Sequence, residues 1–221
     1  MERVNKVKSE NILYSFRRCP FAMRARLALV SAQVPVIIRE VSLKNKPVEL
    51  LTISKNATVP CLKTATKVIP ESLDIMLWAL SEHDPEHLLD IPEIGLDLIE
   101  YCDGPSKKSL DRRKYKSRYE NVELELELRI AKDFLYRLDL LLTQQFLFGQ
   151  KRSLVDLALL PFIRQYAFID NSWFDNQEWY NLKRWLTSFL CSKNFEQIQQ
   201  KFPIWQPGDK PCYFHISDID S

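Results

Sequence analysis

Cys19 is the residue of this chain best suited to act as a nucleophile. It lies between a short β-prone run, Ile12–Phe16, and a predicted helix that begins at Pro20. The start of a helix presents unpaired N–H groups and a partial positive charge, and Arg17 and Arg18 precede the cysteine directly. Both features favour thiolate over thiol, so the pattern predicts a reactive cysteine rather than a buried apolar one.

A two-cysteine redox motif is not formed here, because Ala22 stands where the second thiol would be. A single thiolate can attack a disulfide, but another thiol must then release it from the mixed disulfide. Cys61 would supply that thiol only if the fold brought it close; the alternative is a buried strand residue. We expect the alternative, with a small-molecule thiol from solution completing the cycle.

Two further features are suited to binding a small peptide. Pro60 opens a predicted strand, and the bond before it is a candidate cis peptide that would leave the Val59 backbone free to pair with an extended peptide. An ordinary trans loop proline is the alternative. Ser72 is the predicted N-cap of a helix whose N–H groups could bind a carboxylate, and Glu71 beside it could accept from an ammonium group. A cap without a ligand is the alternative.

The elements that must position these residues alternate between strand and helix. In the helix after Cys19, apolar residues at 23, 27 and 30 form a stripe, with Arg24 and Arg26 off it. The first βαβ unit should be parallel and right-handed, and the last two strands antiparallel. We therefore predict a thioredoxin-like α/β domain over residues 1–83. Its predicted elements are strand 12–16, helix 20–34, strand 36–41, helix 47–51, strands 60–63 and 67–69, and helix 72–82.

The rest of the chain predicts helices. Two prolines and Gly95 indicate a linker over 84–95, and an all-helical domain is expected over 96–221. A helical stripe from position 124 predicts a helix within 121–147, although leucines alternating with glutamates there resemble a strand. Ser153 and Asp156 resemble a capping box that opens a buried helix, 154–168. A further helix is expected over 179–192, followed by an extended, proline-containing tail packed on the surface.

Composition excludes several classes of function. The chain has 221 residues and a net charge of +2, which argues against a nucleic-acid backbone as its main partner. Its four glycines are too far apart for a dinucleotide or P-loop phosphate site. His83 and His87 stand four apart, as in a helical metal pair, but Pro85 between them would break a helix. We therefore expect a polar turn there and no metal site.

The cysteines indicate a reducing compartment. They are five in number and widely spaced, and no C-x-x-C is present, which excludes zinc-ribbon and dithiol redox readings. The N-terminus has no apolar core typical of a signal peptide, and no run of roughly 18 apolar residues is present. We expect a cytoplasmic protein with no membrane partner.

One segment, 107–118, is strongly basic, with seven lysines and arginines in twelve positions. It predicts a solvated face or the electropositive mouth of an anion site, and a nucleic-acid surface is the alternative. Its basic residues are Lys107, Lys108, Arg112, Arg113, Lys114, Lys116 and Arg118.

Taken in order, these residues resemble the cytosolic glutathione transferases, specifically their omega-like, cysteine-using branch. The quoted segments are Arg18-Cys19-Pro20-Phe21-Ala22, Leu43-Lys44-Asn45-Lys46-Pro47, Val59-Pro60, Glu71-Ser72 and Ser153-x-x-Asp156. The likeness is dense over 12–80 and looser afterwards. The sequence departs from the family's pattern at two places around Pro60. The loop before it, residues 55–58, contains no glycine, and Cys61 is unusual after the proline.

The resemblance implies glutathione as co-substrate, no metal, no nucleic-acid partner and a homodimer. It implies a mixed disulfide between Cys19 and glutathione, with Phe21 packed near the sulfur. It assigns the glycyl carboxylate to Lys46, the cysteinyl unit to the Val59 backbone beside Pro60, and the γ-glutamyl ammonium and carboxylate to Glu71 and Ser72.

The activity that we expect is glutathione-dependent thiol transfer or reduction through Cys19, with a small electrophile, disulfide or oxidised acceptor as second substrate. That substrate should occupy a cleft between the domains. Its candidate walls are aromatic residues that could equally be core: Tyr115, Tyr119, Trp173 and Phe174.

Two alternatives stay open. One is a conjugating transferase that stabilises the glutathione thiolate with the Tyr14 or Ser15 hydroxyl. The other is a non-catalytic interaction module on the same fold, with the basic segment 107–118 as its binding surface.

Overall fold

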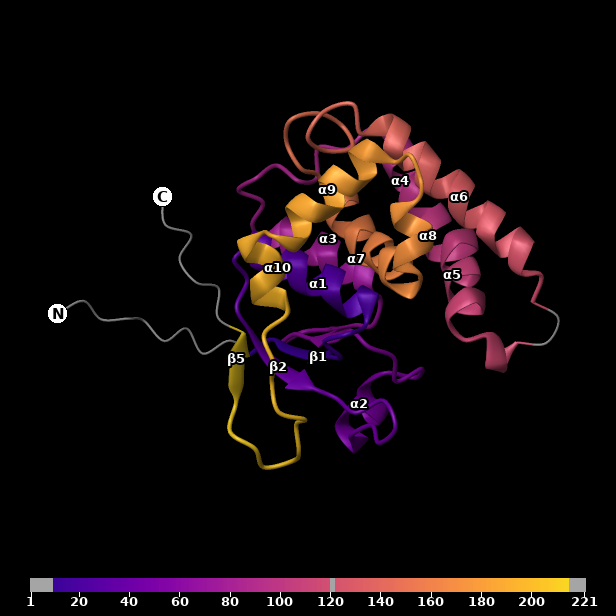
Figure 1. Cartoon of the computed structure of the whole chain (residues 1–221). Helices are drawn as coiled ribbons and strands as arrows, with labels where there is room; N and C mark the ends of the chain where they lie inside the picture. Colours follow the sequence, from indigo (N-terminus) through magenta and orange to yellow (C-terminus); the bar gives the residue numbers. More distant parts are fainter. Residues whose placement is uncertain (1–9, 120–121, 215–221) are drawn as a thin grey trace. The chain divides into compact units, whose positions relative to one another are not determined.

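The computed structural model describes residues 10–119 and 122–214, which form two compact units (Figure 1). The first unit contains the described residues up to His83 together with those from Gln197 onward, and the second runs from Asp84 to Glu196. The first is built on a β-sheet and the second is helical. The predicted fold class, a thioredoxin-like α/β domain with an all-helical domain, is confirmed.

The first unit contains one five-stranded sheet in the order β4-β3-β1-β2-β5. β1 and β2 pair in parallel, with Ile12 opposite Ile37, whereas β3 pairs antiparallel with both β1 and β4. These pairings are those predicted for the first βαβ unit and the last two strands. The strands are β1 (Ile12–Ser15), β2 (Val36–Glu40), β3 (Cys61–Lys63), β4 (Val68–Ile69) and β5 (Cys212–Phe214).

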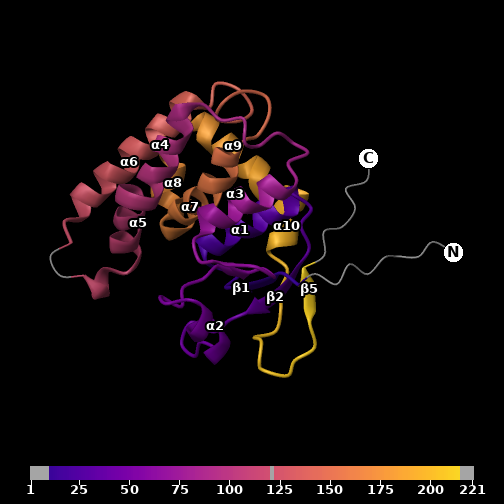
Figure 2. The ribbon, with the colours of Figure 1, turned by 180° about the vertical axis from the view of Figure 1, so that it is seen from behind.

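Three helices cover this sheet. α1 (Pro20–Ser31) and α3 (Ser72–Glu82) lie together on one face, and α2 (Val48–Ile53) lies on the other (Figures 1 and 2). Every residue of α1 except Phe21 is buried. The buried surface of α1 is therefore wider than the predicted apolar stripe, because Arg24 and Arg26 are also buried, at 2% and 0% exposure. Both guanidinium groups have polar partners inside the unit, and these partners make their burial tolerable.

The C-terminal segment belongs to the first unit, which differs from the predicted helical domain over 96–221. β5 pairs antiparallel with β2, with Phe214 opposite Val36, and it lies at the outer edge of the sheet (Figure 2). Upstream, the Trp205 N–H donates to the Glu40 carbonyl oxygen at 2.8 Å. The prolines indicated an extended tail packed on the surface, and the free edge of β2 offers it backbone partners.

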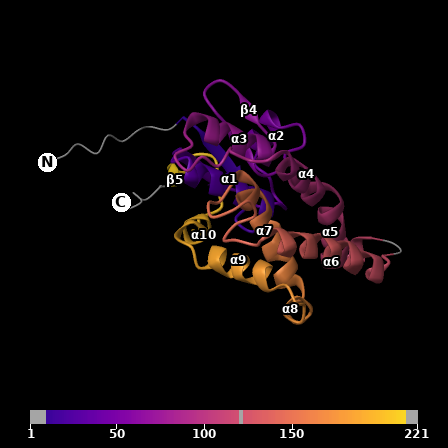
Figure 3. The ribbon, with the colours of Figure 1, turned by 90° about the horizontal axis from the view of Figure 1, so that it is seen from above.

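The second unit is a group of helices arranged around α7 (Figure 3). α7 contacts α4, α5, α8 and α9. Within the described ranges, no helix is both long enough and apolar enough to cross a membrane. The helices are α4 (Glu93–Tyr101), the π-helix η1 (Cys102–Ser106), α5 (Lys107–Lys114), the 3-10 helix η2 (Lys116–Arg118), α6 (Leu124–Leu141), α7 (Leu154–Ile169), α8 (Asn171–Asp175) and α9 (Tyr180–Leu190). α10 (Lys193–Ile198) follows, and its last two residues belong to the first unit.

Several helix boundaries differ from the prediction; α1, for example, ends at Ser31 instead of near 34. α4 begins at Glu93, inside the expected linker, and Gly95 is a helical residue: a Cβ there would lie 2.8 Å from Val155 Cγ2 of α7. This glycine therefore allows close helix packing rather than marking a linker. α6 ends at Leu141 instead of near 147, and a bridge between Phe146 and Gly149 follows. The start of the expected helix, at 121, lies outside the described residues.

The predicted capping box at the start of α7 is present. The Asp156 carboxylate is fully buried and accepts the Ser153 N–H and hydroxyl at 2.8 and 2.7 Å. It also accepts the Leu147 N–H at 3.1 Å and the Trp185 indole N–H at 2.9 Å. Burial raises the pKa of the Asp156 carboxyl, and the hydrogen bonds oppose that rise. One side chain thus links α7, α9 and the loop after α6.

Replacing this carboxylate should destabilise the protein strongly. Asp156→Ala leaves four buried donors without an acceptor, and we expect a loss of about 3 kcal/mol in the free energy of unfolding. Denaturant unfolding measures it. Asp175→Ala, on an exposed position, is the control and should change stability by less than about 0.5 kcal/mol. Equal stability of the two variants would contradict the assigned role.

Candidate functional site

Cys19 lies at the N-terminus of α1. It is the N-cap residue, Pro20 follows as the first helical residue, and the Met23 N–H donates to the Cys19 carbonyl oxygen at 2.9 Å. The Cys19 N–H donates to the Phe16 carbonyl oxygen, also at 2.9 Å, which closes the turn between β1 and α1. The side chain is half-buried and makes no capping hydrogen bond. Its sulfur lies at the positive end of the helix.

The structure brings Cys19 and the Val59–Pro60 segment together. The Cys19 thiol donates to the Val59 carbonyl oxygen, with 3.6 Å between Sγ and oxygen. The Val59–Pro60 peptide bond is cis, which was one of the two predicted alternatives. Among the described residues, the Val59 N–H has no hydrogen-bond partner. One free donor and a carbonyl with a second lone pair thus lie beside the sulfur.

The start of α3 differs from the prediction. Glu71 is the N-cap residue and is exposed, whereas Ser72 is the first helical residue and is 3% exposed. Ser72 does not cap the helix because its hydroxyl oxygen accepts the Arg24 Nε–H at 2.9 Å. A serine hydroxyl that accepts in this way keeps its own proton to donate. The Arg24 guanidinium also lies 5.1 Å from the centre of the Phe21 ring, which connects Phe21 to this end of α3.

These groups offer complementary charges to a tripeptide. Glu71 supplies an exposed carboxylate for an ammonium group, and the first turn of α3 with the Ser72 hydroxyl supplies donors for a carboxylate. Lys46 lies half-buried in the segment between β2 and α2 and supplies a cation. All of these residues belong to the first unit.

The arginines before Cys19 make contacts that the sequence did not indicate. Arg18 is exposed and lies over the Phe16 ring, 5.3 Å from its centre. Arg17 Nη1 donates to Gln199 Oε1 at 3.4 Å. The buried cation near this turn is instead Arg26, paired with Glu40, and sequence reasoning missed both. The signal that could have found it is an arginine inside an otherwise apolar helix.

Cys61 is a core residue and not a second redox thiol. It is completely buried at the start of β3, in a cluster with Tyr14, Val41, Leu50 and Ala57. Burial raises the pKa of the Cys61 thiol to about 11, against a smaller opposing effect of a hydrogen bond with Ser54. The group therefore stays protonated at neutral pH.

The two hydroxyls that a conjugating transferase could use are also buried. Tyr14 is 1% exposed, and its hydroxyl oxygen accepts from Arg39 Nη1 at 2.6 Å. Burial raises the pKa of the Tyr14 phenol, although Arg39 opposes that rise. Ser15 is 0% exposed, and its hydroxyl oxygen accepts from Arg26 Nε at 2.9 Å.

The four aromatic residues predicted to line a second-substrate pocket do not form one group. Trp173 and Phe174 both pack against Trp179, with ring centres 5.4 and 5.6 Å from it. Phe174 is 3% exposed, so it is a core residue with little surface for a substrate. Tyr115 packs with Arg118, 4.3 Å from its ring centre, and Tyr119 is exposed. Among the described residues, no ring contact joins these tyrosines to the tryptophans.

The basic segment 107–118 is partly neutralised. Lys107 pairs with Asp111, and Arg112 pairs with Glu127 at 2.9 Å. Arg113 is buried over the Trp173 ring, 4.3 Å from its centre. Burial lowers the pKa of the Arg113 guanidinium. These contacts leave a surface less positive than the sequence alone indicates.

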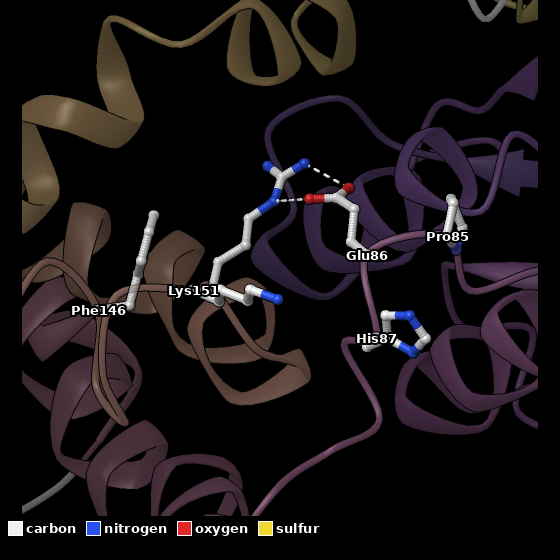
Figure 4. Close-up of a pocket in the computed structure, with 6 residues that line it drawn as sticks. Pro85, Glu86, His87, Phe146 and Lys151 are labelled. Atoms are coloured by element: carbon white, nitrogen blue, oxygen red, sulfur yellow. Dashed lines mark hydrogen bonds and ion pairs between the residues drawn. The ribbon is translucent and has the colours of Figure 1, made fainter.

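The second unit contains a pocket of about 420 Å³ around an ion pair (Figure 4). Arg152 donates to both carboxylate oxygens of Glu86 at 2.5 Å, and Pro85, His87, Phe146 and Lys151 complete the lining. No cysteine, serine or threonine side chain lines it. Within residues 10–119 and 122–214, no three His, Cys, Asp or Glu side chains gather into a group that could hold a metal ion.

Comparison with known protein families shows to which family the chain belongs. The N-terminal domain of glutathione S-transferases matches residues 13–87, and the C-terminal domain matches residues 105–192. The chain belongs to the glutathione transferase family. The first match covers Cys19, Lys46, Val59 and Ser72, the residues whose geometry is given above.

Individual relatives of this glutathione transferase are distant. Glutathione S-transferase DHAR3, chloroplastic, of Arabidopsis thaliana is 32% identical over 149 residues, which cover 65% of this chain and 53% of that protein. The chain thus matches about half the length of this curated relative.

Two solved structures share the fold. Glutathione transferase Omega 3C of Trametes versicolor is 21% identical, with a TM-score of 0.73 over 86% of this chain and 84% of that one. A family member from Pseudomonas fluorescens, solved with two glutathione bound, is 19% identical, with a TM-score of 0.74 over 88% and 94%.

The thiols of Cys19 and Cys61 should differ sharply in reactivity. In the folded protein at pH 8 we expect iodoacetamide to modify Cys19 and not Cys61, since a thiol with a pKa of about 11 is about 0.1% ionised at that pH and is fully buried. Peptide mapping by mass spectrometry measures both, with exposed Cys191 as the control for reagent activity. Modification of Cys61 at the rate of Cys191 without denaturant would contradict this assignment.

Proposed function

We propose that this chain is a glutathione-dependent thiol transferase of the omega-like, cysteine-using type, with Cys19 as its nucleophile. The observation that carries the proposal is the contact of Cys19 with Val59: the sulfur lies 3.6 Å from the Val59 carbonyl oxygen at the start of α1. A peptide that paired with the Val59 backbone would present its own sulfur to Cys19. Such alignment of two reacting atoms lowers the barrier to exchange.

The reaction is an exchange of disulfide bonds. The Cys19 thiolate attacks the glutathione sulfur of a mixed disulfide R–S–S–G; the Cys19–S–S–G bond forms as the original bond breaks, and R–S⁻ leaves with the electron pair and takes a proton from water. A glutathione thiolate then attacks the glutathione sulfur of the adduct, which releases oxidised glutathione and restores the Cys19 thiolate. The net result is R–SH and oxidised glutathione from R–S–S–G and one glutathione.

Glutathione is the proposed co-substrate, and each part of it meets a suitable group. Glu71 accepts from the γ-glutamyl ammonium, and the Ser72 hydroxyl donates to the neighbouring carboxylate, while Arg24 holds the hydroxyl oxygen. The Val59 N–H and carbonyl oxygen pair with the cysteinyl unit. Lys46 attracts the glycyl carboxylate, and Phe21 packs near the sulfur.

Burial of the competing hydroxyls supports thiol transfer over conjugation. Tyr14 and Ser15 are both less than 2% exposed, and their hydroxyl oxygens already accept from buried or half-buried arginines. Both residues are less exposed than Cys19. Cys19, in contrast, is half-buried and lies at the helix N-terminus.

Three further parts of the proposal concern setting and partners. All five cysteines are free, which fits a reducing compartment, and we propose the cytoplasm. We also propose a homodimer, the commonest arrangement of soluble oligomers. The second substrate is a disulfide, an oxidised acceptor or a small electrophile, with Tyr115, Tyr119 and Trp173 as its proposed contacts; Phe174 is omitted because it is buried.

The central test is the site of glutathione attachment. Incubation with oxidised glutathione should add one glutathione to Cys19, and Cys19→Ser should abolish thiol transfer because a hydroxyl cannot form the mixed disulfide. Intact-mass and peptide mass spectrometry measure the adduct. Cys191→Ser, which removes an exposed thiol, is the matched control and should keep full activity. Adducts only on other cysteines, or undiminished thiol transfer by Cys19→Ser, would overturn the proposal.

The Ser72 hydroxyl should contribute to glutathione binding. Ser72→Ala removes a hydrogen bond to a charged carboxylate, so we expect KM for glutathione to rise about tenfold. Steady-state kinetics measures it. Ser81→Ala, at the opposite end of α3, is the control because its hydroxyl donates to the Trp78 carbonyl within the helix. An unchanged KM for Ser72→Ala would remove this residue from the binding site.

A further inference from the structure

Behind the turn that carries Cys19, two charged side chains form a buried ion pair. Arg26 of α1 is completely buried, and its Nη2 donates to Glu40 Oε2, at the end of β2, at 2.6 Å. The other carboxylate oxygen of Glu40 accepts the Arg17 N–H, also at 2.6 Å. Glu40 therefore connects the cation of α1 to the backbone two residues before Cys19.

Arg26 uses its remaining nitrogens on the two segments that adjoin this turn. Nε donates to the hydroxyl oxygen of Ser15, the last residue of β1, at 2.9 Å. Nη1 donates to the Ile198 carbonyl oxygen at 3.1 Å. A planar guanidinium can satisfy three acceptors in fixed directions at once, which a lysine ammonium on a flexible stem does less well.

The C-terminal segment completes the arrangement. Gln199 Oε1 accepts from Arg17 Nη1 at 3.4 Å, and the Trp205 N–H donates to the Glu40 carbonyl oxygen at 2.8 Å. Both partners of the Glu40–Arg17 hydrogen bond are therefore also bound by the C-terminal segment, Arg17 by Gln199 and Glu40 by Trp205. This explains physically why the segment after α10 belongs to the first unit.

The pair also affects the charge at Cys19. Burial lowers the pKa of Arg26; the Glu40 carboxylate and the Cys19 thiolate oppose this, and the Arg17 cation adds to it. Because electrostatic attraction is mutual, the Arg26 cation favours the thiolate form of Cys19. This electrostatic effect adds to a geometric one, because Glu40 of the pair also holds the turn through the Arg17 N–H.

We propose that the Arg26–Glu40 pair is a positioning element for Cys19, holding the Phe16–Cys19 turn so that the sulfur faces Val59. Neither side chain is assigned a contact with glutathione. The catalytic meaning of this inference rests on the proposed thiol transfer. The effect of the pair on the position and reactivity of the Cys19 sulfur can be measured without glutathione.

The double variant Arg26→Met/Glu40→Leu separates positioning from stability. Replacing a buried ion pair by apolar residues of similar size often leaves stability unchanged, so we expect a melting temperature within about 5 °C of the unaltered chain. Without the anchor, the rate constant for alkylation of Cys19 by iodoacetamide should fall about tenfold or more, and kcat for thiol transfer with it. KM for glutathione should change less than about twofold, since Lys46, Glu71 and Ser72 are untouched.

A single variant and a control complete the experiment. Arg26→Lys keeps the charge but not the three directed contacts, and we expect alkylation of Cys19 to slow about threefold or more. Arg152→Met breaks a comparable two-pronged ion pair, with Glu86 in the second unit, and should leave the Cys19 rate unchanged (Figure 4).

The outcomes distinguish this inference from the proposed function. A folded double variant, or a folded Arg26→Lys variant, that alkylates Cys19 at the unaltered rate would overturn the positioning role. A raised KM for glutathione with unchanged kcat would overturn it as well. If the unaltered chain takes up no glutathione on Cys19, the proposed function fails, while the alkylation rates still decide the role of the pair.

Discussion

A completely buried guanidinium is the constraint on which the first unit depends. Arg26 has no access to water, so it needs acceptors from the protein, and it finds them on three separate segments: Ser15, Glu40 and Ile198. Those segments are the end of β1, the end of β2 and the end of α10. Satisfying one cation therefore fixes the β1–α1 turn, which carries Cys19, against the rest of the sheet.

The way in which buried polar groups are paired also supports sulfur rather than oxygen as the proposed reactive atom. Three hydroxyls of the first unit each accept from an arginine: Ser15 from Arg26, Tyr14 from Arg39, and Ser72 from Arg24. Of these, Ser72 lies at the start of a helix, where its remaining proton suits an anion. Cys19 is the group left half-exposed at a helix N-terminus, and its thiolate is the form that such a position stabilises.

Much of the fold could be read from local signals. Period-two and period-3.6 patterns depend only on neighbouring residues, and they located β1 to β4 and α1 to α3 of the first unit and the long α7, but not β5. Pro20 at the first helical position and the Ser153–Asp156 capping box are likewise local, because their contacts lie within a few residues. Where the signal was ambiguous, as for Gly95, a linker and a tightly packed helix looked alike.

By itself, the sequence determined the order of the elements from β1 to α3, the placement of Cys19 at a helix start beside a later Val59–Pro60 segment, and the family resemblance. Only the tertiary structure decided that Cys61 is buried core, that Phe174 is not a pocket wall, and that the chain after residue 197 joins the first sheet. It also decided which arginine serves the Cys19 turn. The reason is that these outcomes depend on contacts between residues far apart in the chain, whose partners no local pattern specifies, whereas helix starts and strand alternation are set by neighbours.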